Sequence, residues 1–375
     1  MEVTCMTYSI EEEIDFLRES IKIYAPSWKE KAIVELLEKI FHQFKDTIVV
    51  DDIGNFKVTL GKGKPVLMLS SHMDTISQPM EFSEDDENIY GRGAVDCRPS
   101  LLAMALAAHR VASKGLKGTI IFTGVVAEEV STKGVEFLLK GMQKPDYAMF
   151  GEPTAHKICI AYKGRVWLHV TIKLSPGHSS APWIYLNGFE ILYEFYTMLN
   201  EKLQDLIKHK KLSPFYTPRA TITTINSDTI PNMLPEEVNA DVDVRIPPSI
   251  KEDAILDIVD ELIEQLDRQY KDMDPRYSFE LVIKSAANGI RVQTNNDLCK
   301  FLAESVEKIL GKKSKFVKKT GTCFMNNIGN YFSCPIVTYG PGDPALEHTT
   351  GEFIPKKDFI ASVDILEQTI FKLMD

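Results

Sequence analysis

Residues 65–71 (PVLMLSS) form a continuous apolar run that leads directly into His72-Met73-Asp74. Such a run is typical of a strand that is buried on both of its faces, as strands of parallel sheets are. Residues 118–127 form a second run of this kind, and the alanine-rich residues 99–113 between the two runs predict a helix. Strand, helix and strand in this order predict an α/β domain with a mostly parallel sheet.

The pattern changes near Lys163-Gly164, where segments that alternate apolar and polar side chains begin. Such alternation predicts strands with one covered face, and two amphipathic segments predict helices. The strands are expected at residues 166–174, 220–226, 238–246 and 278–284, and the helices at residues 188–207 and 249–270. Four strands with two helices on one face make a small α+β domain. We therefore expect a catalytic domain of residues 1–163 and 286–375, interrupted by an inserted domain of residues 164–285.

The composition is that of an ordinary globular protein, with 375 residues of which 44% are hydrophobic and 26% charged. It excludes disordered and fibrous classes, and six well-separated cysteines predict neither a disulfide framework nor a CxxC metal site. No apolar run approaches the roughly 18 residues that a membrane span needs, and the first residues lack the pattern of a secretory signal. We therefore expect a cytoplasmic protein without a membrane partner. The net charge of −10 argues against nucleic acid as a partner.

Histidines and carboxylates follow the predicted buried strands, where open α/β sheets place their ligands. The segments are SHMD (71–74), GRGAVD (91–96), EE (128–129), GEPT (151–154) and, far down the chain, EHTT (347–350). Each segment alone has a structural explanation, such as a hydrogen-bonded histidine, a solvated glutamate pair or a helix-capping aspartate. Together they supply two histidines and three carboxylates, a mixed N/O donor set that suits two divalent ions such as zinc or cobalt.

The spacing of these residues also suggests roles beyond metal binding. Asp74 can hold the second imidazole nitrogen of His72 and raise its basicity. The side chains of Glu128 and Glu129 diverge because they are adjacent, so one can bind metal while the other faces the substrate as a free carboxylate. Two metal ions lower the pKa of a water and polarise a carbonyl, and a nearby carboxylate moves the proton to the leaving amine. This is amide hydrolysis, and the chain has neither GxSxG nor GxxxxGK[ST].

The motifs SSHMD, GRGAVD, AEE, GEPT and EHTTGEF, in this order and with an insertion, resemble the co-catalytic zinc aminoacylase/carboxypeptidase family. Acetylornithine deacetylase and succinyl-diaminopimelate desuccinylase belong to this family. The resemblance implies that His72, Asp96 and Glu152 hold one metal ion, and that Asp96, Glu129 and His348 hold the other. It also implies that Asp96 bridges the ions, that Glu128 is the general acid/base, and that Asp74 supports His72. The inserted domain resembles the family's lid and dimerisation domain.

Three positions in the insertion match further family segments. The glycine-flanked His178 of Pro176-Gly177-His178-Ser179-Ser180 could reach a developing oxyanion, and by resemblance it does so in the partner subunit's site of a homodimer. Arg245 matches the family's carboxylate-binding arginine, a role that suits a bidentate guanidinium. Asn232 matches the family's Asn-x-x-Pro segment. The structural alternatives are a solvated loop histidine, an exposed strand arginine and a turn asparagine.

Several segments resemble the branch of the family that releases lysine or ornithine from an amino-group carrier protein in lysine and arginine biosynthesis. They are AYKGR (161–165), KTGT (319–322) with Met325-Asn326, and YGPGD (339–343). The resemblance implies a substrate in which the amino acid is joined to the side chain of the carrier's C-terminal glutamate. Gly321 and Thr322 would belong to the substrate loop. The carrier is small and acidic, and five lysines in residues 312–319 and three in residues 208–211 offer it basic patches, although lysine runs are commonly just solvated.

The chain departs from the family pattern at two places. Cys97-Arg98-Pro99 follows Asp96 where the family has a small pair such as Lys-Gly, and Cys323-Phe324 follows Thr322 where it has Ser-Asp. The second departure leaves the choice between lysine and ornithine open. Two alternative functions also remain: a small-molecule deacylase or dipeptidase of the same family, and a metal-binding pseudo-enzyme that does not hydrolyse.

Overall fold

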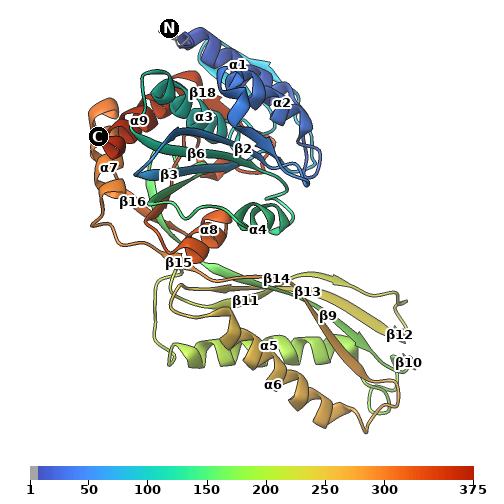
Figure 1. Cartoon of the computed structure of the whole chain (residues 1–375). Coiled ribbons are helices and arrows are strands. Elements are labelled where there is room, and N and C mark those ends of the chain that lie inside the picture. The colour runs from blue at the N-terminus through green and yellow to red at the C-terminus, as the bar shows by residue number, and fades with distance from the viewer. Residues whose placement is uncertain (1–6) are drawn as a thin grey trace. The chain divides into compact units, whose positions relative to one another are not determined.

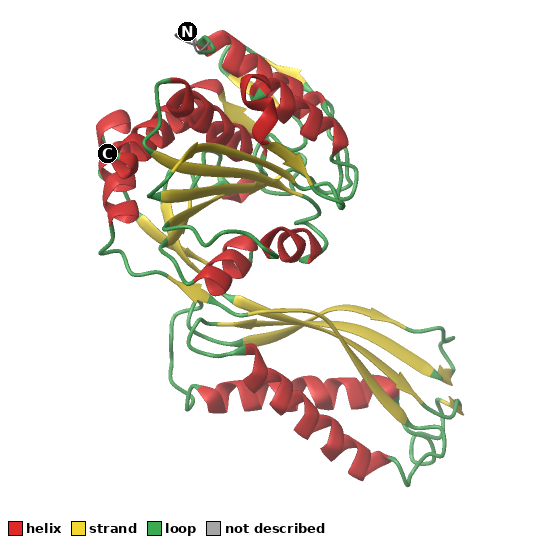
Figure 2. Cartoon of the chain, in the orientation of Figure 1, coloured by secondary structure: helices red, strands yellow, loops and turns green. Residues whose placement is uncertain are grey.

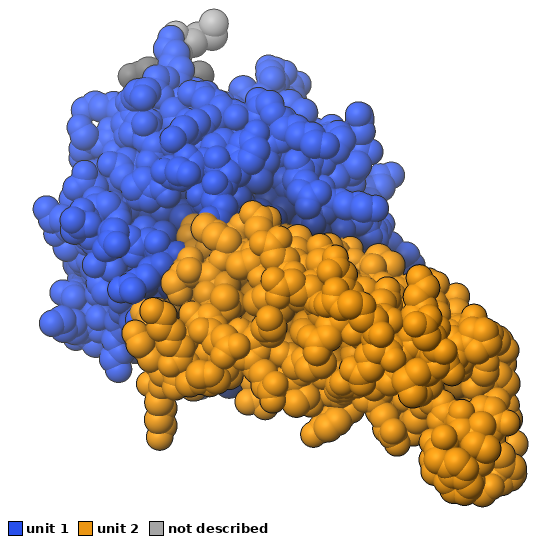
Figure 3. All heavy atoms as spheres, turned by 90° about the horizontal axis from the view of Figure 1, so that it is seen from below, with its two compact units in different colours: residues 1–161, 291–318, 323–375 blue, residues 162–290, 319–322 orange. Residues whose placement is uncertain are grey.

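The computed structural model describes residues 7–375 and divides the chain into two compact units, which Figure 3 colours blue and orange. Unit 1 consists of the chain up to Ala161, Arg291–Lys318 and Cys323–Asp375. Unit 2 consists of Tyr162–Ile290 together with the short segment Lys319–Thr322, which the sequence analysis had placed in the catalytic domain. None of the described helices is both long and apolar enough to cross a membrane.

Unit 1 is built on a nine-stranded sheet with the order β1-β2-β6-β3-β7-β17-β8-β15, in which β16 pairs with β8. The strands are β1 (Ile48–Val50), β2 (Phe56–Lys62), β3 (Val66–His72), β6 (Gly118–Val125), β7 (Tyr147–Gly151), β8 (Ile158–Tyr162), β15 (Ile290–Arg291), β16 (Phe316–Lys319) and β17 (Ile336–Thr338). The central strands β6, β3, β7 and β17 are parallel, whereas β2 and β8 run antiparallel to their inner neighbours. Every residue of β3 and β6 is buried, as the two apolar runs predict. The mixed α/β fold with a mainly parallel central sheet is confirmed.

Helices cover both faces of this sheet (Figure 1). α3 and α9 lie on one face, and α4 and α8 on the other. The helices of unit 1 are α1 (Ile10–Lys22), α2 (Lys31–Ile40), α3 (Arg98–Ser113), α4 (Lys133–Leu139), α7 (Asp297–Leu310), α8 (Phe324–Phe332) and α9 (Lys356–Met374). α3 is buried along nearly its whole length because alanines let it approach the sheet and α9 closely. A small sheet of β4 (Ser83–Glu84), β5 (Asn88–Tyr90) and β18 (Phe353–Pro355) completes the unit.

Unit 2 is a four-stranded antiparallel sheet with two helices on one face (Figure 2). The strand order is β11 (Arg219–Asn226), β13 (Glu237–Ile246), β9 (Gly164–Lys173) and β14 (Ser278–Ala287), and the helices are α5 (Gly188–Leu206) and α6 (Glu252–Tyr270). Along β9 and β13 every second side chain is buried against the helices, so the other side chains lie on the uncovered face. The short strands β10 (Gly177–His178) and β12 (Met233–Leu234) form a separate pair.

Candidate metal centre

The carboxyl ends of the parallel strands of unit 1 bring the predicted metal ligands together. His72 is the last residue of β3, Glu152 follows the last residue of β7, and Glu129 lies four residues beyond the end of β6. Asp96 lies two residues before α3, in the turn that links the small sheet to that helix. His348 comes from the segment after β17, so the chain returns to this sheet edge after the insertion.

Two groups of donor atoms share Asp96. In the first group, His72 Nε2 lies 3.1 Å from Asp96 Oδ1 and 3.9 Å from Glu152 Oε1. In the second group, His348 Nε2 lies 3.1 Å from Asp96 Oδ2 and 3.0 Å from Glu129 Oε2. The two oxygens of Asp96 therefore face different histidines, which is the arrangement of a carboxylate that bridges two ions.

The spacing of the donor atoms fits a metal ion in each group. Ligand atoms at roughly 2.0–2.1 Å from a tetrahedral zinc ion are about 3.3 Å from each other. The separations around His348 and the one between His72 and Asp96 are close to this value, whereas Glu152 lies farther from His72, at 3.9 Å. His72, Asp96 and Glu152 are buried, so their charges need a compensating cation. Hydrogen bonds to Asp96 and Glu129 raise the pKa of His348 to about 10, which shows how strongly this cluster attracts positive charge.

Asp74 connects the metal ligands to the Glu128-Glu129 pair. Its carboxylate accepts hydrogen bonds from the backbone N–H groups of Glu128 at 3.0 Å and Glu129 at 3.2 Å, and from the Ser27 hydroxyl at 2.6 Å. His72 Nδ1 lies 3.1 Å from the carbonyl oxygen of Asp74 and 3.4 Å from its carboxylate. Asp74 thus orients both His72 and the turn that carries the two glutamates.

Glu128 and Glu129 differ in their surroundings. Glu129 faces His348, whereas Glu128 is half-buried and forms no ion pair with either histidine within residues 7–375. Burial, reinforced by the negative charges of Glu129, Asp74 and Asp96, raises the pKa of Glu128 to about 8. In the metal-free arrangement Glu128 therefore holds a proton near neutral pH, which is the property of a group that exchanges protons with a substrate.

Three residues that support the site were not singled out by the sequence analysis. Glu352, in the same EHTTGEF segment as His348, is fully buried and forms an ion pair with Arg92. Glu30 accepts a hydrogen bond from the backbone N–H of Ala127 at 2.9 Å, just before the glutamate pair. The position of Arg92 and Glu352 inside two of the motifs was the only signal for them, since contacts between distant segments leave no local pattern.

Cys97, next to Asp96, is also part of the site. Its Sγ atom lies 3.0 Å from the Ser71 hydroxyl, and it belongs with His72 and Asp96 to a group of potential ligand atoms. The thiol is fully buried, and burial raises its pKa to about 12. A thiol binds metal as the thiolate, a form that a bound cation would favour, so Cys97 is a further candidate ligand on the His72 side.

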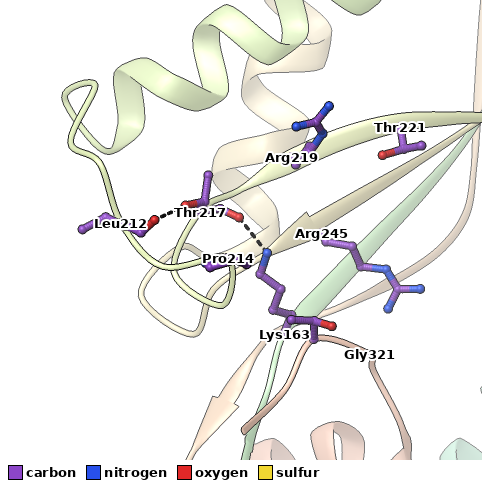
Figure 4. Close-up of a pocket in the computed structure, with 9 residues that line it drawn as sticks. Lys163, Leu212, Pro214, Thr217, Arg219, Thr221, Arg245 and Gly321 are labelled. Carbon is purple, nitrogen blue, oxygen red and sulfur yellow. Dashed lines mark hydrogen bonds between the residues drawn. The ribbon is translucent and has the colours of Figure 1, made fainter. Parts of the chain in front are cut away.

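The predicted substrate-binding residues and His178, which was predicted to be catalytic, lie in unit 2 and form two separate groups. His178 and Asn232 are close, because β10 pairs with β12 and the backbone N–H of Ser179 donates to the Asn232 carbonyl at 3.1 Å. Arg245 donates a hydrogen bond to the Thr322 hydroxyl at 3.0 Å, and Arg245 and Gly321 line a cavity of about 620 Å³ (Figure 4). Neither His178 nor Asn232 is among the residues that line this cavity.

The family model described as Peptidase family M20/M25/M40 matches residues 68–372. The chain belongs to this family. The resemblance inferred from the five motifs is therefore confirmed, and the chain is an amide hydrolase of a metallopeptidase family.

Among curated proteins, the chain is 29% identical to a putative LysW-lysine/LysW-ornithine hydrolase of Pyrobaculum aerophilum, over 95% of each chain. It is also 29% identical to the LysW-lysine/LysW-ornithine hydrolase of Sulfurisphaera tokodaii, over 91% of this chain and 89% of the relative. It is 25% identical to a probable succinyl-diaminopimelate desuccinylase of Staphylococcus aureus, over 96% of this chain and 97% of the relative. Among solved structures, an M20 family metallo-carboxypeptidase from Sulfolobus solfataricus has the same fold, with a TM-score of 0.79 at 16% identity over 97% of this chain and 99% of the other.

Proposed function

We propose that this protein hydrolyses the amide bond between lysine or ornithine and the side-chain carboxyl of the C-terminal glutamate of an acidic amino-group carrier protein. The observation that carries the hydrolytic part is Asp96, whose two oxygens face His72 and His348 at 3.1 Å each. The hydrolases of Pyrobaculum aerophilum and Sulfurisphaera tokodaii, whose names give LysW-lysine and LysW-ornithine as substrates, support the choice of substrate. We place the reaction in the cytoplasm, in amino-acid biosynthesis.

Two divalent ions, zinc or cobalt, are the cofactors of this proposal. His72, Asp96 and Glu152 would hold one ion, and Asp96, Glu129 and His348 the other. When bound, such a pair of ions polarises the scissile carbonyl and lowers the pKa of the attacking water. Asp74 fixes the orientation of His72 through contacts to its Nδ1 side.

Glu128 is the general acid/base of the reaction. It accepts the proton of the attacking water as a carboxylate and delivers it to the leaving α-amino group of lysine or ornithine. The bound cations would favour the carboxylate form that starts the reaction, and burial raises the affinity of this carboxyl for the proton that it then takes from the water. The Asp74 carboxylate keeps the backbone of Glu128 in place during both transfers.

Unit 2 supplies the residues that position the substrate. Arg245 binds a carboxylate of the substrate, and Gly321 and Thr322 line the same region, since Thr322 accepts a hydrogen bond from Arg245 and donates one to the Lys163 carbonyl at 2.9 Å. His178, with Asn232 beside it, stabilises the developing oxyanion in the partner subunit's site. The proposal therefore includes a homodimer in which unit 2 serves as lid and dimerisation domain.

The lysine-rich segment Lys312–Lys319 is the proposed docking surface for the acidic carrier. Lys312, Lys313, Lys315 and Lys318 are exposed. Opposite charges on two proteins accelerate their association, and salt screens this effect. The basic patch at Lys208, Lys210 and Lys211 is also exposed and could add to the same attraction.

The test is the release of amino acids from a carrier conjugate by the zinc- or cobalt-loaded protein. We expect lysine, ornithine or both to be released, at a rate that falls as ionic strength rises. A small-molecule deacylase is the second candidate, supported by the similarity to the succinyl-diaminopimelate desuccinylase of Staphylococcus aureus. Rapid cleavage of N-acetylornithine or succinyl-diaminopimelate without any cleavage of the conjugate would replace the first proposal by the second. A pseudo-enzyme would hydrolyse none of these substrates.

A further inference from the structure

Three arginines form a row across neighbouring strands of unit 2. In the sheet register, Arg219 of β11 lies opposite Arg245 of β13, and Arg245 lies opposite Arg165 of β9. Side chains of directly opposite residues lie on the same face of a sheet, here the face that the helices leave uncovered. Like charges at such positions repel each other, so the row favours anions that lie against it.

The contacts around this row leave an excess of positive charge. The Asp243 carboxylate lies 3.1 Å from Arg165 Nε, and it also accepts hydrogen bonds from Arg245 Nε at 2.8 Å and Nη2 at 3.1 Å. One carboxylate thus serves two guanidinium groups. Arg219 is exposed and forms no ion pair with any of residues 7–375. The pairing of Arg165 and Arg245 with Asp243 fixes their geometry, whereas Arg219 is left for a ligand.

Lys163 adds a further charge from the wall of the cavity. Its side chain is buried and donates a hydrogen bond from Nζ to the Thr217 carbonyl at 2.6 Å, which attaches the segment before β11 to the start of β9 (Figure 4). Burial, with the charge of Arg245 as the second cause, lowers the pKa of Lys163. Lys163, Arg219 and Arg245 all line the cavity of about 620 Å³, together with Thr221, Gly321 and the apolar side chains of Leu212 and Pro214.

We propose that this cavity binds a ligand with two carboxylate groups, of which Arg245 holds one and Arg219 the other. This inference rests on the proposed function and specifies its substrate class. An amino acid joined through its α-amino group to the side-chain carboxyl of a C-terminal glutamate has two α-carboxylates, one on each side of the scissile amide. An N-acetylated amino acid has only one. Arg219 is therefore a specificity-determining residue that favours γ-glutamyl amides over acetyl amides.

Calorimetric titration of the full chain can measure this specificity without hydrolysis, in the Glu128→Gln background and at fixed salt. The first ligand is N-acetyl-γ-glutamyl-lysine, linked through the lysine α-amino group. The second is the same compound with the glutamate α-carboxyl converted to an amide, so that one carboxylate is lost. A charged hydrogen bond is worth about 1.5–3 kcal/mol, so we expect the first ligand to bind roughly 10- to 100-fold more tightly.

Substitutions at Arg219 assign the preference to this residue. Arg219→Gln should reduce the difference between the two ligands to less than about threefold while leaving the affinity for the amide ligand unchanged. Arg219→Lys should keep part of the preference because it retains a charge without the bidentate geometry. Arg268→Gln is the matched control, since Arg268 is a 72% exposed arginine of α6 that pairs with Glu264.

The outcomes separate this inference from the proposed function. Equal binding of the two ligands, or a preference that survives Arg219→Gln, would overturn the two-carboxylate cavity. If the ligand preference and its loss in Arg219→Gln are both found, but the metal-loaded protein releases nothing from a carrier conjugate, the cavity stands and the proposed function fails. If the conjugate is hydrolysed but Arg219→Gln has no effect on binding, the proposed function stands and the two-carboxylate cavity fails.

Discussion

The carboxylate of Glu352 accepts a hydrogen bond from the backbone N–H of Val95 at 3.2 Å, directly before Asp96, the proposed bridging ligand. The same oxygen accepts a second hydrogen bond from the N–H of Gly93 at 3.0 Å, and the other oxygen forms an ion pair with Arg92. A residue 256 positions further along the chain therefore determines where the Asp96 loop lies. Glu352 is a positioning residue, because it contacts the loop and not the metal donors.

Glu352→Gln should weaken metal binding more than it weakens catalysis by the fully loaded protein. The amide keeps one acceptor but loses the ion pair with Arg92, so the Asp96 loop is held less firmly. Substitution of a residue that supports the metal ligands typically lowers metal affinity by about 10- to 100-fold. Metal titration followed by activity measurements at saturating zinc checks this expectation. Glu84→Gln is the control, because Glu84 is ion-paired to Arg18 and Lys356. An unchanged metal affinity would contradict the role of Glu352.

Glu128→Gln should retain both metal ions and lose turnover by about 10²- to 10⁴-fold, the usual contribution of a general acid/base. The amide cannot take up and deliver the proton. Elemental analysis of the purified variant, together with its rate on the carrier conjugate, checks both halves of this prediction. Glu136→Gln, at an exposed glutamate of the neighbouring helix α4, is the control. Turnover at the wild-type rate in Glu128→Gln would show that another group moves the proton.

Removal of metal should abolish activity, and zinc or cobalt should restore it. Asp96→Asn should reduce the metal content from two ions per chain toward one or none, because the amide offers a single oxygen where Asp96 offers two. Dialysis against a chelator, followed by stoichiometric titration, measures both effects. Full activity of the chelated protein would exclude a metal-dependent reaction.

His109 should make the stability of unit 1 depend on pH. The imidazole is fully buried, 4.7 Å from the ring of Tyr8, and burial lowers the pKa of His109 from 6.5 to about 4. A lowered folded-state pKa means that the stabilising contribution is complete above pH 6.5 and is lost as the pH falls from 6.5 to 4. The loss amounts to about 3 kcal/mol at most.

Denaturant unfolding at several pH values tests this effect in a His109→Phe variant, which keeps an aromatic ring at the position. The variant should lose less stability than the wild type between pH 6.5 and pH 4. His209→Gln, at a histidine whose side chain is 70% exposed, should follow the wild type. An identical pH dependence in His109→Phe and the wild type would assign the acid sensitivity to other groups.

Charge reversal in the lysine-rich segment should affect the carrier conjugate only. Lys312→Glu combined with Lys315→Glu should raise KM for the conjugate by about tenfold at low salt, because the acidic partner is no longer attracted. The KM for a γ-glutamyl dipeptide should stay the same. Steady-state kinetics at two salt concentrations distinguish the cases, and the analogous double change at Lys208 and Lys211 shows whether the second patch contributes. Equal effects on both substrates would point to a folding defect.

The elements with a strong local signal were predictable. β3 and β6 are continuous apolar runs, and α1 begins with a capping box of Ser9 and Glu12, a pattern that these residue types and their spacing make visible in the sequence. Apolar spacing continues through Phe41 and Phe44 and would extend the second helix to Phe44, but α2 ends at Ile40 and a 3₁₀ turn, His42–Thr47, follows. Helix α8 was missed, since Asn326, Asn327 and Gly329 favour turns over helices and only burial against the sheet compensates for this.

The sequence indicated only those site residues that stand in short motifs of histidines and carboxylates. SSHMD, AEE and GEPT follow β3, β6 and β7, and parallel strands present their carboxyl ends at one sheet edge, whereas GRGAVD and EHTTGEF come from segments next to the small sheet. The contacts of Glu352 and Glu30 join segments that are distant in sequence, so no periodicity or spacing indicates them. The arginine row depends on the register between strands. An alternating pattern does not fix this register, because a shift by two residues keeps the same side chains on the same face.

The assignment of Lys319–Thr322 to unit 2 means that the chain passes between the units four times, not twice. Deletion of residues 164–285 with a short linker in their place would leave this segment without the Arg245 guanidinium that Thr322 contacts. Unit 2 therefore cannot be removed from the chain, or transferred to a relative, as one continuous segment. Exchange of substrate preference between relatives would require the transfer of a discontinuous piece of chain, with the four-residue segment included.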